Sequence, residues 1–482
     1  MAVRPVEEAA IEAVLPPGDL LHDEHGATGV VAGLRHAGPI AVAGLVANGA
    51  NVVVTVVIAR LLTSRGYGEL AQLNGVFLFL SMPGSALLVG VVRRATALSV
   101  AGRSGYVRQF AKRLHRLAIC GLVILVLAAW LLERVIAHAL SLGSPGGIVP
   151  IVCAGGIWLA LSIDRGLLQA KRSYRALAAN LLVEGGMRMV FVLALTAAGL
   201  GVTGACLGVM LGEACAAAHA RWMSSRKWTG RDTASDNGEN PASVPSRSSR
   251  RHLAVDVLNA FGCLAFLALL QNLDVILLGR EAPKYSGEYA AISVAAKAIV
   301  FAAIALGGYL LPEATIRWHK GEHAIRQLAT TALILAVPTV VLLIASLAAP
   351  RILLKLAFGH RLAGASGSFA TLVGAMAFLC ITVLLTNYLL GAGIRWIVVV
   401  LGIGTVVSGF VFYSTHGIPG PTARADLIIQ AVLAAVVAVG FLQAHRSHQR
   451  LTPAGLELKS LAAHAGRVNG KEPGRVDGRE RP

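Results

Sequence analysis

Charged side chains are scarce in this sequence. Asp, Glu, Lys and Arg make up 14% of the 482 residues, whereas hydrophobic residues make up 55% and the mean hydropathy is +0.68. This excludes a soluble globular protein, which typically carries about 25% charged residues. Apolar runs of about 20 residues recur, and each is long enough to cross a bilayer as a helix. Because lipid cannot satisfy backbone hydrogen bonds, we predict an all-α polytopic membrane protein.

Closely spaced cysteines are also missing. No CxxC pair occurs, and the six cysteines all lie within apolar segments: Cys120, Cys153, Cys206, Cys215, Cys263 and Cys380. Scattered cysteines within apolar segments are typical of small packing residues, whereas disulfide frameworks and metal sites need recognisable cysteine spacings. We therefore predict no disulfide, no metal site and no cofactor.

A secretory signal is not evident at the start of the chain either. Residues 1–38 are comparatively polar and acidic and lack a basic start followed by an apolar run. We expect this segment to be a disordered cytoplasmic arm.

Twelve apolar segments are candidate transmembrane helices. They lie at roughly 39–59, 72–92, 117–133, 147–164, 176–198, 200–220, 252–279, 287–311, 327–348, 367–390, 396–414 and 425–444. Residues 221–251 are rich in Ser, Asn, Asp, Gly and Pro, which is typical of a flexible linker. We therefore predict two six-helix lobes, 39–220 and 252–444, and a basic disordered tail, 445–482.

The distribution of basic residues predicts the orientation. Of the 43 Lys and Arg residues, 32 fall in the termini and the even-numbered connections, and only 9 in the odd-numbered ones. Basic loops mark the cytoplasmic side, so both termini are predicted to be cytoplasmic. Since the net charge of +18 sits in these loops, we interpret it as contact with anionic lipid headgroups and predict no nucleic-acid partner.

A short repeat relates the two halves at a shift of 219 residues. The sequence Gly68-Glu69-Leu70-Ala71 falls on Gly287-Glu288-Tyr289-Ala290, and Ala95-Thr96 falls on Ala314-Thr315. Six spans per half preserve the orientation, so the repeat is parallel, about an axis along the membrane normal. Chance identity between Ala- and Gly-rich segments is the alternative.

Two segments resemble a known family. NVVVTVVIARLLTSRGYGELAQL, residues 51–73, resembles the first span and outer loop of bacterial polysaccharide flippases. NLDVILLGREAPKYSGEYAAISVAAK, residues 272–297, followed by LLPEAT, residues 310–315, resembles their seventh and eighth spans. These proteins belong to the multidrug/oligosaccharidyl-lipid/polysaccharide (MOP) exporter superfamily. The resemblance implies two lobes that face each other in an inverted V around a central cavity, and transport by alternating access.

The resemblance suggests a flippase for a polyprenyl-(di)phosphate-linked oligosaccharide in the bacterial cytoplasmic (inner) membrane, serving cell-surface polysaccharide biosynthesis. The alternative is a multidrug or metabolite exporter of the same superfamily, driven by a coupling cation. A membrane glycosyltransferase is disfavoured because the first outer loop, residues 60–71, carries a single acid, Glu69. We therefore predict a transporter and not an enzyme.

Two basic residues lie near the midplane of predicted spans. Arg188 is about 18 Å into span five and Lys297 about 15 Å into span eight, at about 1.5 Å per residue. Intramembrane charge tends to line transport paths, and we predict that both bind substrate phosphate. The alternative is structural pairing, of Arg188 with Glu184 one turn away and of Lys297 with Asp274.

Acidic and amide side chains complete the candidate site. Asp274, Glu184 and Glu213 are candidates for ion coupling. Asn48 and Asn51 in span one are candidates for hydrogen bonding to sugar, with interhelical hydrogen bonds as the alternative. Glu213 follows Gly204, Gly208 and Gly212, a glycine face that predicts close helix packing.

Overall fold

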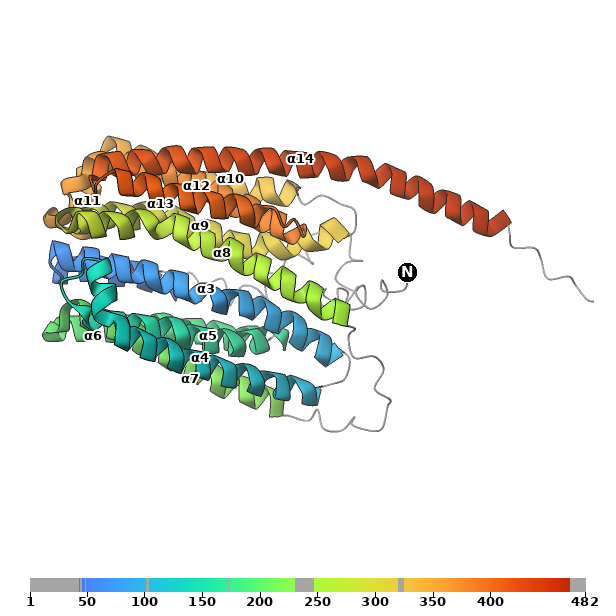
Figure 1. Ribbon diagram of the computed structural model, residues 1–482, viewed down its shortest axis with the longest axis horizontal. Coiled ribbons are helices and arrows are strands. Elements are labelled where there is room, and N and C mark those ends of the chain that lie inside the picture. Colours follow the sequence, from blue (N-terminus) through green and yellow to red (C-terminus); the bar gives the residue numbers. More distant parts are fainter. Residues whose placement is uncertain are drawn as a thin grey trace, which may run out of the picture.

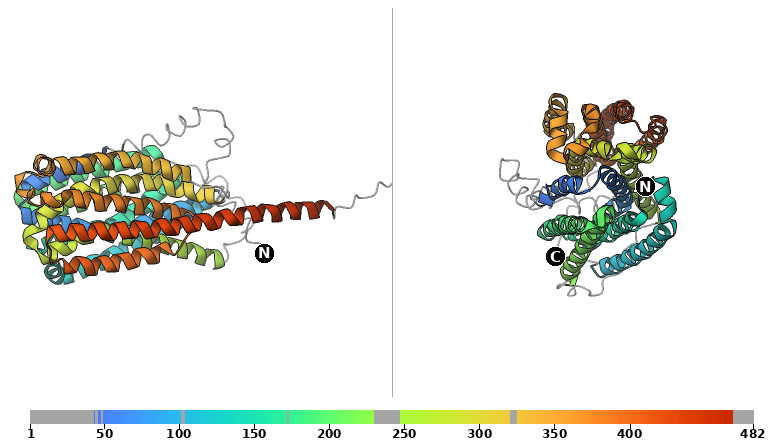
Figure 2. Two further views of the ribbon diagram at one scale, coloured as in Figure 1. Left: turned by 90° about the horizontal axis from the view of Figure 1, so that it is seen from above. Right: turned by 90° about the vertical axis from the view of Figure 1, so that its left-hand side faces the viewer.

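A computed structural model of the chain describes residues 43, 46–47, 49–100, 104–171, 173–229, 247–319 and 325–468. The predicted arm, residues 1–38, and the end of the predicted tail, residues 469–482, lie outside these residues. Two groups of long helices run roughly side by side (Figure 1, Figure 2). The first lobe consists of a helix at Gly49–Leu61 and of α3 Ser64–Val100, α4 Ser104–Ala139, α5 Ile148–Ala170, α6 Tyr174–Leu195 and α7 Gly201–Thr229.

The second lobe is built in the same way. It consists of α8 Arg247–Glu281, α9 Ser286–His319, α10 Ile325–Ala348, α12 Phe369–Gly391, α13 Ile397–Ser414 and α14 Pro419–Val468. The short helix α11, Pro350–Phe358, connects α10 to α12 and is too short to span a bilayer. In Figure 1 the blue and green helices of the first lobe lie below the yellow and red helices of the second.

The predicted all-α membrane architecture is confirmed. Ten helical segments of the described chain are long and apolar enough to cross a membrane, and one of them, Tyr174–Arg226, contains both α6 and α7. The helix Gly49–Leu61, at the position of the first predicted span, is shorter and also apolar. Which end of the bundle faces the cytoplasm stays a prediction from the basic residues.

Two helices extend beyond the predicted apolar segments, for one physical reason. Helix α14 continues to Val468, although we predict disorder from residue 445, and α4 begins at Ser104, well before the predicted span at 117. A hydropathy pattern locates where a helix leaves the hydrocarbon, but the helix itself continues into water wherever its residues favour helix. The linker likewise shortens, since α7 ends at Thr229 and α8 begins at Arg247.

The packing inside the lobes agrees with the repeat. A Cβ on Gly185 of α6 would come within 3.0 Å of the Cα of Ala47, near the helix Gly49–Leu61. In the second lobe, a Cβ on Gly402 of α13 would come within 3.1 Å of the ring of Phe266 on α8. Ala47 and Phe266 are 219 residues apart, which is the shift that aligns the two sequences. The same pair of helices therefore packs together in both lobes.

The lobes meet at one end of the bundle. A Cβ on Gly68 of α3 would lie 2.7 Å from the backbone nitrogen of Gly287 on α9, so these two repeat-equivalent glycines touch. Nearby, the Tyr67 and Phe358 rings lie 6.1 Å apart, and Arg60 donates to the Leu356 carbonyl at 2.7 Å. We predict this end to be the outer one.

At the opposite end, α3 packs within its own lobe. Val91 and Ala95 belong to a small apolar core whose other members come from α4 and α5, namely Val107, Ala111, Ala118, Ile163 and Leu167. Helix α3 packs against α5 of its own lobe along its length, from Leu73 at Gly147 to Val91 at Gly166, and contacts the second lobe only over its first part. The contacts described above hold the lobes together at the predicted outer end.

The glycine contact between the lobes gives the first prediction. Gly287→Ala places a Cβ that overlaps the Ser64 carbonyl oxygen, and we expect a loss of about 1–3 kcal/mol, as for overpacked cores. In contrast, a Cβ on Gly121 of α4 meets nothing within 4 Å, so Gly121→Ala gains about 0.5–1 kcal/mol of helix stability. Thermal unfolding of the purified protein tests this, and equal shifts for the two variants would show that the contact does not constrain the lobes.

Candidate functional site

A chain of four charged side chains runs through the first lobe. Arg165 of α5 forms an ion pair with Glu184 of α6, and Arg188 of α6 donates to Glu184 at 2.7 Å. Arg188 also forms an ion pair with Glu213 of α7. The side chains of Arg165 and Glu213 are 5% and 0% exposed. Arg165 donates as well to Asn180 at 2.7 Å, so the network joins three helices.

The glycine face of α7 positions this network. A Cβ on Gly208 would overlap the backbone at Val192, and one on Gly212 would lie 2.7 Å from the Cα of Arg188. The predicted close packing is therefore present, with α6 and α7 antiparallel. They are joined by a turn in which Gly199 has φ 90° and Gly201 φ 53°, a conformation that glycine adopts without strain. Glu213, next to Gly212, is thus held beside Arg188.

The charge in the first-lobe network is balanced. Two guanidinium groups face two carboxylates, and the Glu184–Arg188 pair that the sequence allows is formed, with Glu213 and Arg165 added to it. A buried ion pair offsets its desolvation only when its geometry and additional hydrogen bonds are good. Our alternatives for Arg188 were binding of substrate phosphate and pairing with Glu184, and in this conformation its guanidinium contacts two carboxylates.

A second polar cluster lies in the other lobe. Lys297 of α9 places its Nζ 3.7 Å from Asp274 Oδ1 and donates to Asn272 Oδ1 at 3.4 Å. The Tyr289 hydroxyl donates to Asp274 Oδ2 at 3.1 Å. Asp274 is fully buried and the Lys297 side chain is 6% exposed. The two candidates from α8 and α9 therefore do lie together.

Sequence reasoning missed a second carboxylate in this cluster. Asp426 of α14 is fully buried and accepts a hydrogen bond from Gln430 at 3.1 Å; Gln430 also donates to the Leu270 carbonyl at 3.3 Å. Leu270 is one turn from Asp274 on α8, so the Gln430 contact places Asp426 beside this cluster. An Asp and a Gln one turn apart inside an apolar span were the available signal, but Asp426 lies at the start of the predicted span, 425–444, and is not among the candidates.

The charge in the second-lobe cluster is not balanced. One ammonium faces two carboxylates, in contrast to the first lobe. Within the described chain, Asp426 Oδ2 and Gln430 Oε1 are buried acceptors with no hydrogen-bond partner. Such groups are costly to leave unmatched in a low-dielectric interior. With both carboxylates ionised, one ammonium and two carboxylates leave a net negative charge, which one further cation or proton would neutralise.

The remaining candidates fall outside the two clusters. Asn48 lies outside the described residues. Asn51 is half-buried on the helix Gly49–Leu61, and its backbone carbonyl accepts a hydrogen bond from Thr55 at 2.8 Å. No group of three His, Cys, Asp or Glu residues that could hold a metal occurs among the residues described. Two intramembrane clusters are thus the positions where the structure concentrates buried charge.

Outside the two clusters, a further buried carboxylate ties three helices of the first lobe together. Asp164 of α5 contacts the His115 Nε2 of α4 at 2.9 Å and accepts a hydrogen bond from Ser224 of α7 at 2.6 Å. Arg221 lies 3.5 Å away. These contacts lie towards the end of the bundle that we predict to be cytoplasmic, and their number indicates a structural role for Asp164.

The balance of the first-lobe network can be tested by stability. Glu213→Leu leaves an excess buried positive charge, and we expect a loss of about 3–5 kcal/mol. Adding Arg188→Met removes the excess and leaves Arg165 facing Glu184, so the double variant should be more stable than Glu213→Leu alone. Thermal unfolding of the purified variants measures both. A double variant that is destabilised by the sum of the two single losses would contradict the ionic coupling.

Comparison with known proteins identifies the fold. No known family profile matches the sequence, and no curated protein matches it. Among solved structures, a MOP superfamily transporter from Pyrococcus furiosus is similar with a TM-score of 0.59 at 14% identity, over 86% of this chain and 96% of its own. An inward-facing MATE family transporter of the same superfamily has a TM-score of 0.59 at 12% identity, over 84% and 95%.

A third structure extends the comparison. The Vibrio cholerae MATE transporter VcmN in its bent form has a TM-score of 0.54 at 13% identity, over 92% of this chain and 98% of its own. At such identities the likeness concerns the fold. The chain thus has the fold of MOP superfamily transporters over nearly the whole length of these proteins.

Proposed function

We propose that this chain is a cation-coupled flippase that moves a polyprenyl-(di)phosphate-linked oligosaccharide, or a related glycolipid, across the bacterial cytoplasmic membrane by alternating access. The transporter fold and the resemblance of residues 51–73 and 272–297 to polysaccharide flippases support the class of protein. The observation that carries the proposal is the second-lobe cluster, in which one buried lysine faces two buried carboxylates.

The position of Lys297 suits a residue that links cargo to a coupling ion. It lies on α9 and its partner Asp274 on α8, and these are the helices of the second lobe that pack against α3 of the first. An ammonium group binds phosphate through charge-assisted hydrogen bonds. Lys297 is therefore a buried cation near the boundary between the lobes, where the family places its cavity.

The excess carboxylate supplies a mechanism of coupling. Asp274 holds Lys297 at 3.7 Å while Asp426 adds a second negative charge to the cluster. A proton or a monovalent cation that joins the carboxylates neutralises part of this charge and weakens the attraction of Asp274 for the ammonium. Lys297 is then released towards substrate phosphate. Carboxylate and phosphate thus compete for one lysine, which reconciles its pairing with a role in binding.

Contact between the lobes at the predicted outer end is compatible with loading of the substrate from the cytoplasm. The lobes touch through Gly68 and Gly287 at the end that we predict to be outer. Arg188 and Glu184, bound within the balanced first-lobe network, hold their helices in place in this scheme, and Glu213 completes that network. The ion-coupling role is thereby assigned to Asp274 and Asp426.

Removing the buried ammonium tests the substrate. In Lys297→Met we expect display of surface polysaccharide to fall about tenfold or more, because a hydrogen bond to a charged group contributes about 1.5–3 kcal/mol. Lipid-linked glycan should accumulate on the inner leaflet, as in a strain without the protein. Lys284→Met, at an exposed lysine, is the matched control. Normal display in Lys297→Met, at equal amounts of inserted protein, would remove Lys297 from the mechanism.

Neutralising the second carboxylate tests the coupling. In Asp426→Asn the cluster holds one ammonium and one carboxylate, so it no longer needs an additional cation. We expect transport by the variant in proteoliposomes to lose its response to an imposed proton or sodium gradient, while Glu281→Gln, at an exposed site, keeps it. An unchanged gradient dependence in Asp426→Asn would place the coupling elsewhere.

One observation favours a second candidate, a cation-coupled exporter of drugs or metabolites. Among the described residues of the two clusters, Arg165, Arg188 and Lys297 each pair with a carboxylate, so neither cluster carries net positive charge. Such a site also suits cationic cargo. Hypersensitivity of a deletion strain to lipophilic cations, with normal surface polysaccharide, would support this exporter in place of the flippase.

A further inference from the structure

The contact between the lobes continues from the two repeat-equivalent glycines along α3 and α8, which lie side by side (Figure 1). A Cβ on Gly279 of α8 would overlap the side-chain amide of Gln72 on α3. Further from the predicted outer end, a Cβ on Gly75 of α3 would lie 3.2 Å from the Cβ of Asn272 on α8. Each close contact uses a glycine. We call the three pairs the glycine interface: Gly68–Gly287, Gln72–Gly279 and Gly75–Asn272.

The third pair of the glycine interface includes a residue of the second-lobe cluster. Asn272 is 6% exposed, and its side-chain amide is hydrogen-bonded at both ends. Its Nδ2 donates to the Ala268 carbonyl at 2.8 Å, and its Oδ1 accepts from Lys297 Nζ at 3.4 Å. This orientation of the amide suits both partners, because a carbonyl accepts and an ammonium donates. Asn272 thus lies between α3 of the first lobe and the buried lysine.

The two partners of Lys297 differ in charge. Asp274, at 3.7 Å, offsets the charge of the ammonium, whereas the amide of Asn272 is neutral and leaves that charge in place. An ammonium has three N–H donors, so it can bind the amide oxygen and a phosphate oxygen at the same time. A neutral acceptor therefore holds the lysine in position without competing with phosphate for its charge.

We propose that Asn272 is a positioning residue, which makes the affinity of Lys297 for phosphate depend on the position of the lobes. This inference rests on the proposed function. While Gly75 lies against Asn272, the amide stays in place and supports the ammonium. When the lobes separate at this depth, the amide can turn, and the ammonium is left to Asp274. Bound phosphate then favours the closed interface, because a ligand shifts an equilibrium by its difference in affinity for the two states.

A small movement is enough to change this contact. Gly75 is seven residues from Gly68, about 10 Å along α3, so a tilt of about 10° about the outer glycine contact displaces it by about 2 Å. A gap of this size removes most of the van der Waals contact between α3 and the Asn272 side chain. The orientation of the amide therefore follows the position of the lobes.

Binding of a polyprenyl phosphate to the full chain in lipid nanodiscs tests the inference, with native mass spectrometry as the measurement. We expect Asn272→Ala to bind this probe about tenfold more weakly, because the ammonium loses a hydrogen bond to its neutral acceptor. Asn272→Asp has nearly the same shape and should bind at least as weakly, because the added carboxylate neutralises the ammonium. Gln271→Ala removes the neighbouring buried amide of α8 and is the matched control, which should bind as the wild type does.

Thermal unfolding without the probe separates positioning from packing. Asn272→Ala and Gln271→Ala each delete a buried amide from the same helix, so we expect similar shifts in Tm. A loss of phosphate affinity in Asn272→Ala alone is the result that positioning predicts. A purely structural Asn272 would lower Tm and leave the affinity of the folded protein unchanged.

A double-variant cycle tests the link to the first lobe. Gly75→Ala presses a methyl group onto Asn272, and we expect binding to weaken about threefold, as for coupled neighbours. In Asn272→Ala the methyl group still meets a Cβ, but no amide remains to be displaced from Lys297. Gly75→Ala should therefore have little further effect in that background.

Three results would overturn the inference: wild-type affinity in Asn272→Ala, wild-type affinity in Asn272→Asp, or full additivity of Gly75→Ala and Asn272→Ala. Its failure can be told apart from failure of the proposed function. If the wild type and Asn272→Ala bind the probe equally while Lys297→Met does not bind it, only the role of Asn272 fails. If the wild type does not bind polyprenyl phosphate, the proposed function fails and this inference fails with it.

Discussion

Charge inside a bilayer has to be neutralised where it lies, and this constraint organises the whole molecule. The two lobes neutralise their buried charges differently. In the first lobe two arginines meet two glutamates across α5, α6 and α7, and the glycine face of α7 brings the helices close enough for these pairs to form. In the second lobe one lysine pairs with Asp274 of α8, and Asp426 of α14 is a second buried carboxylate in the same cluster. The charges of the first network balance, whereas the second cluster has one carboxylate in excess.

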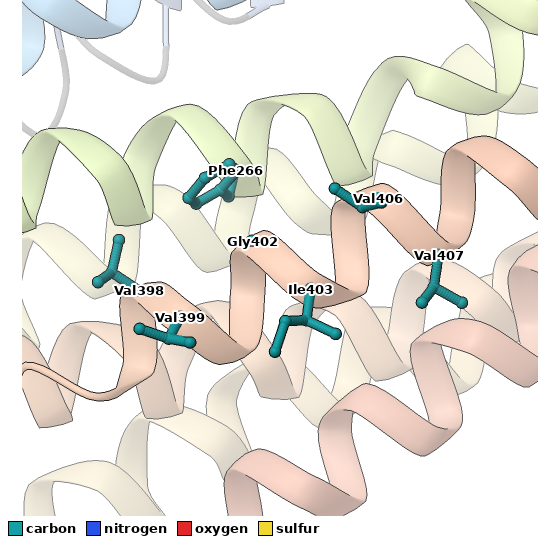
Figure 3. A pocket seen from close by; sticks show the side chains of 7 residues that line it. All are labelled: Phe266, Val398, Val399, Gly402, Ile403, Val406 and Val407. Atoms are coloured by element: carbon teal, nitrogen blue, oxygen red, sulfur yellow. The ribbon is translucent and has the colours of Figure 1, made fainter.

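This asymmetry in buried charge distinguishes the two lobes within a repeated architecture. The backbone packing of the repeat is shared, as the equivalent contacts Gly185–Ala47 and Gly402–Phe266 illustrate. The polar residues are not shared, because a repeat keeps a fold as long as the helix contacts persist, and the side chains between them are free to diverge. The second lobe also carries an apolar groove between α8 and α13, lined by Phe266, Gly402 and Ile403 among others (Figure 3).

How much the sequence predicts depends on how local each feature is. Hydropathy located the spans, and spacing of one helical turn found the Glu184–Arg188 pair. Lys297 and Asp274 were within reach because α8 and α9 are consecutive. The contribution of Asp426 depends on α14 packing against α8, which no local pattern reveals. Arg165 was counted as a loop residue because a basic side chain reads as the end of a span, although a paired arginine can lie deeper. The length of α14 was not predicted for a similar reason: hydropathy shows which residues lie in hydrocarbon, but it does not show where the helix ends.

Gly68 and Gly287 occupy equivalent positions in the two lobes and touch each other, so the axis that relates the lobes passes between them. In the proposed alternating access, the lobes pivot about this contact. Helix α3 starts here and has 37 residues, so its far end lies about 55 Å away, and a tilt of about 10° displaces that end by about 10 Å. Because Gly68 and Gly287 have no side chains, few atoms at the contact have to repack when the lobes tilt. In the proposed alternating access, the close contact of two glycines thus lets a small tilt at one end of the bundle produce a wide opening at the other.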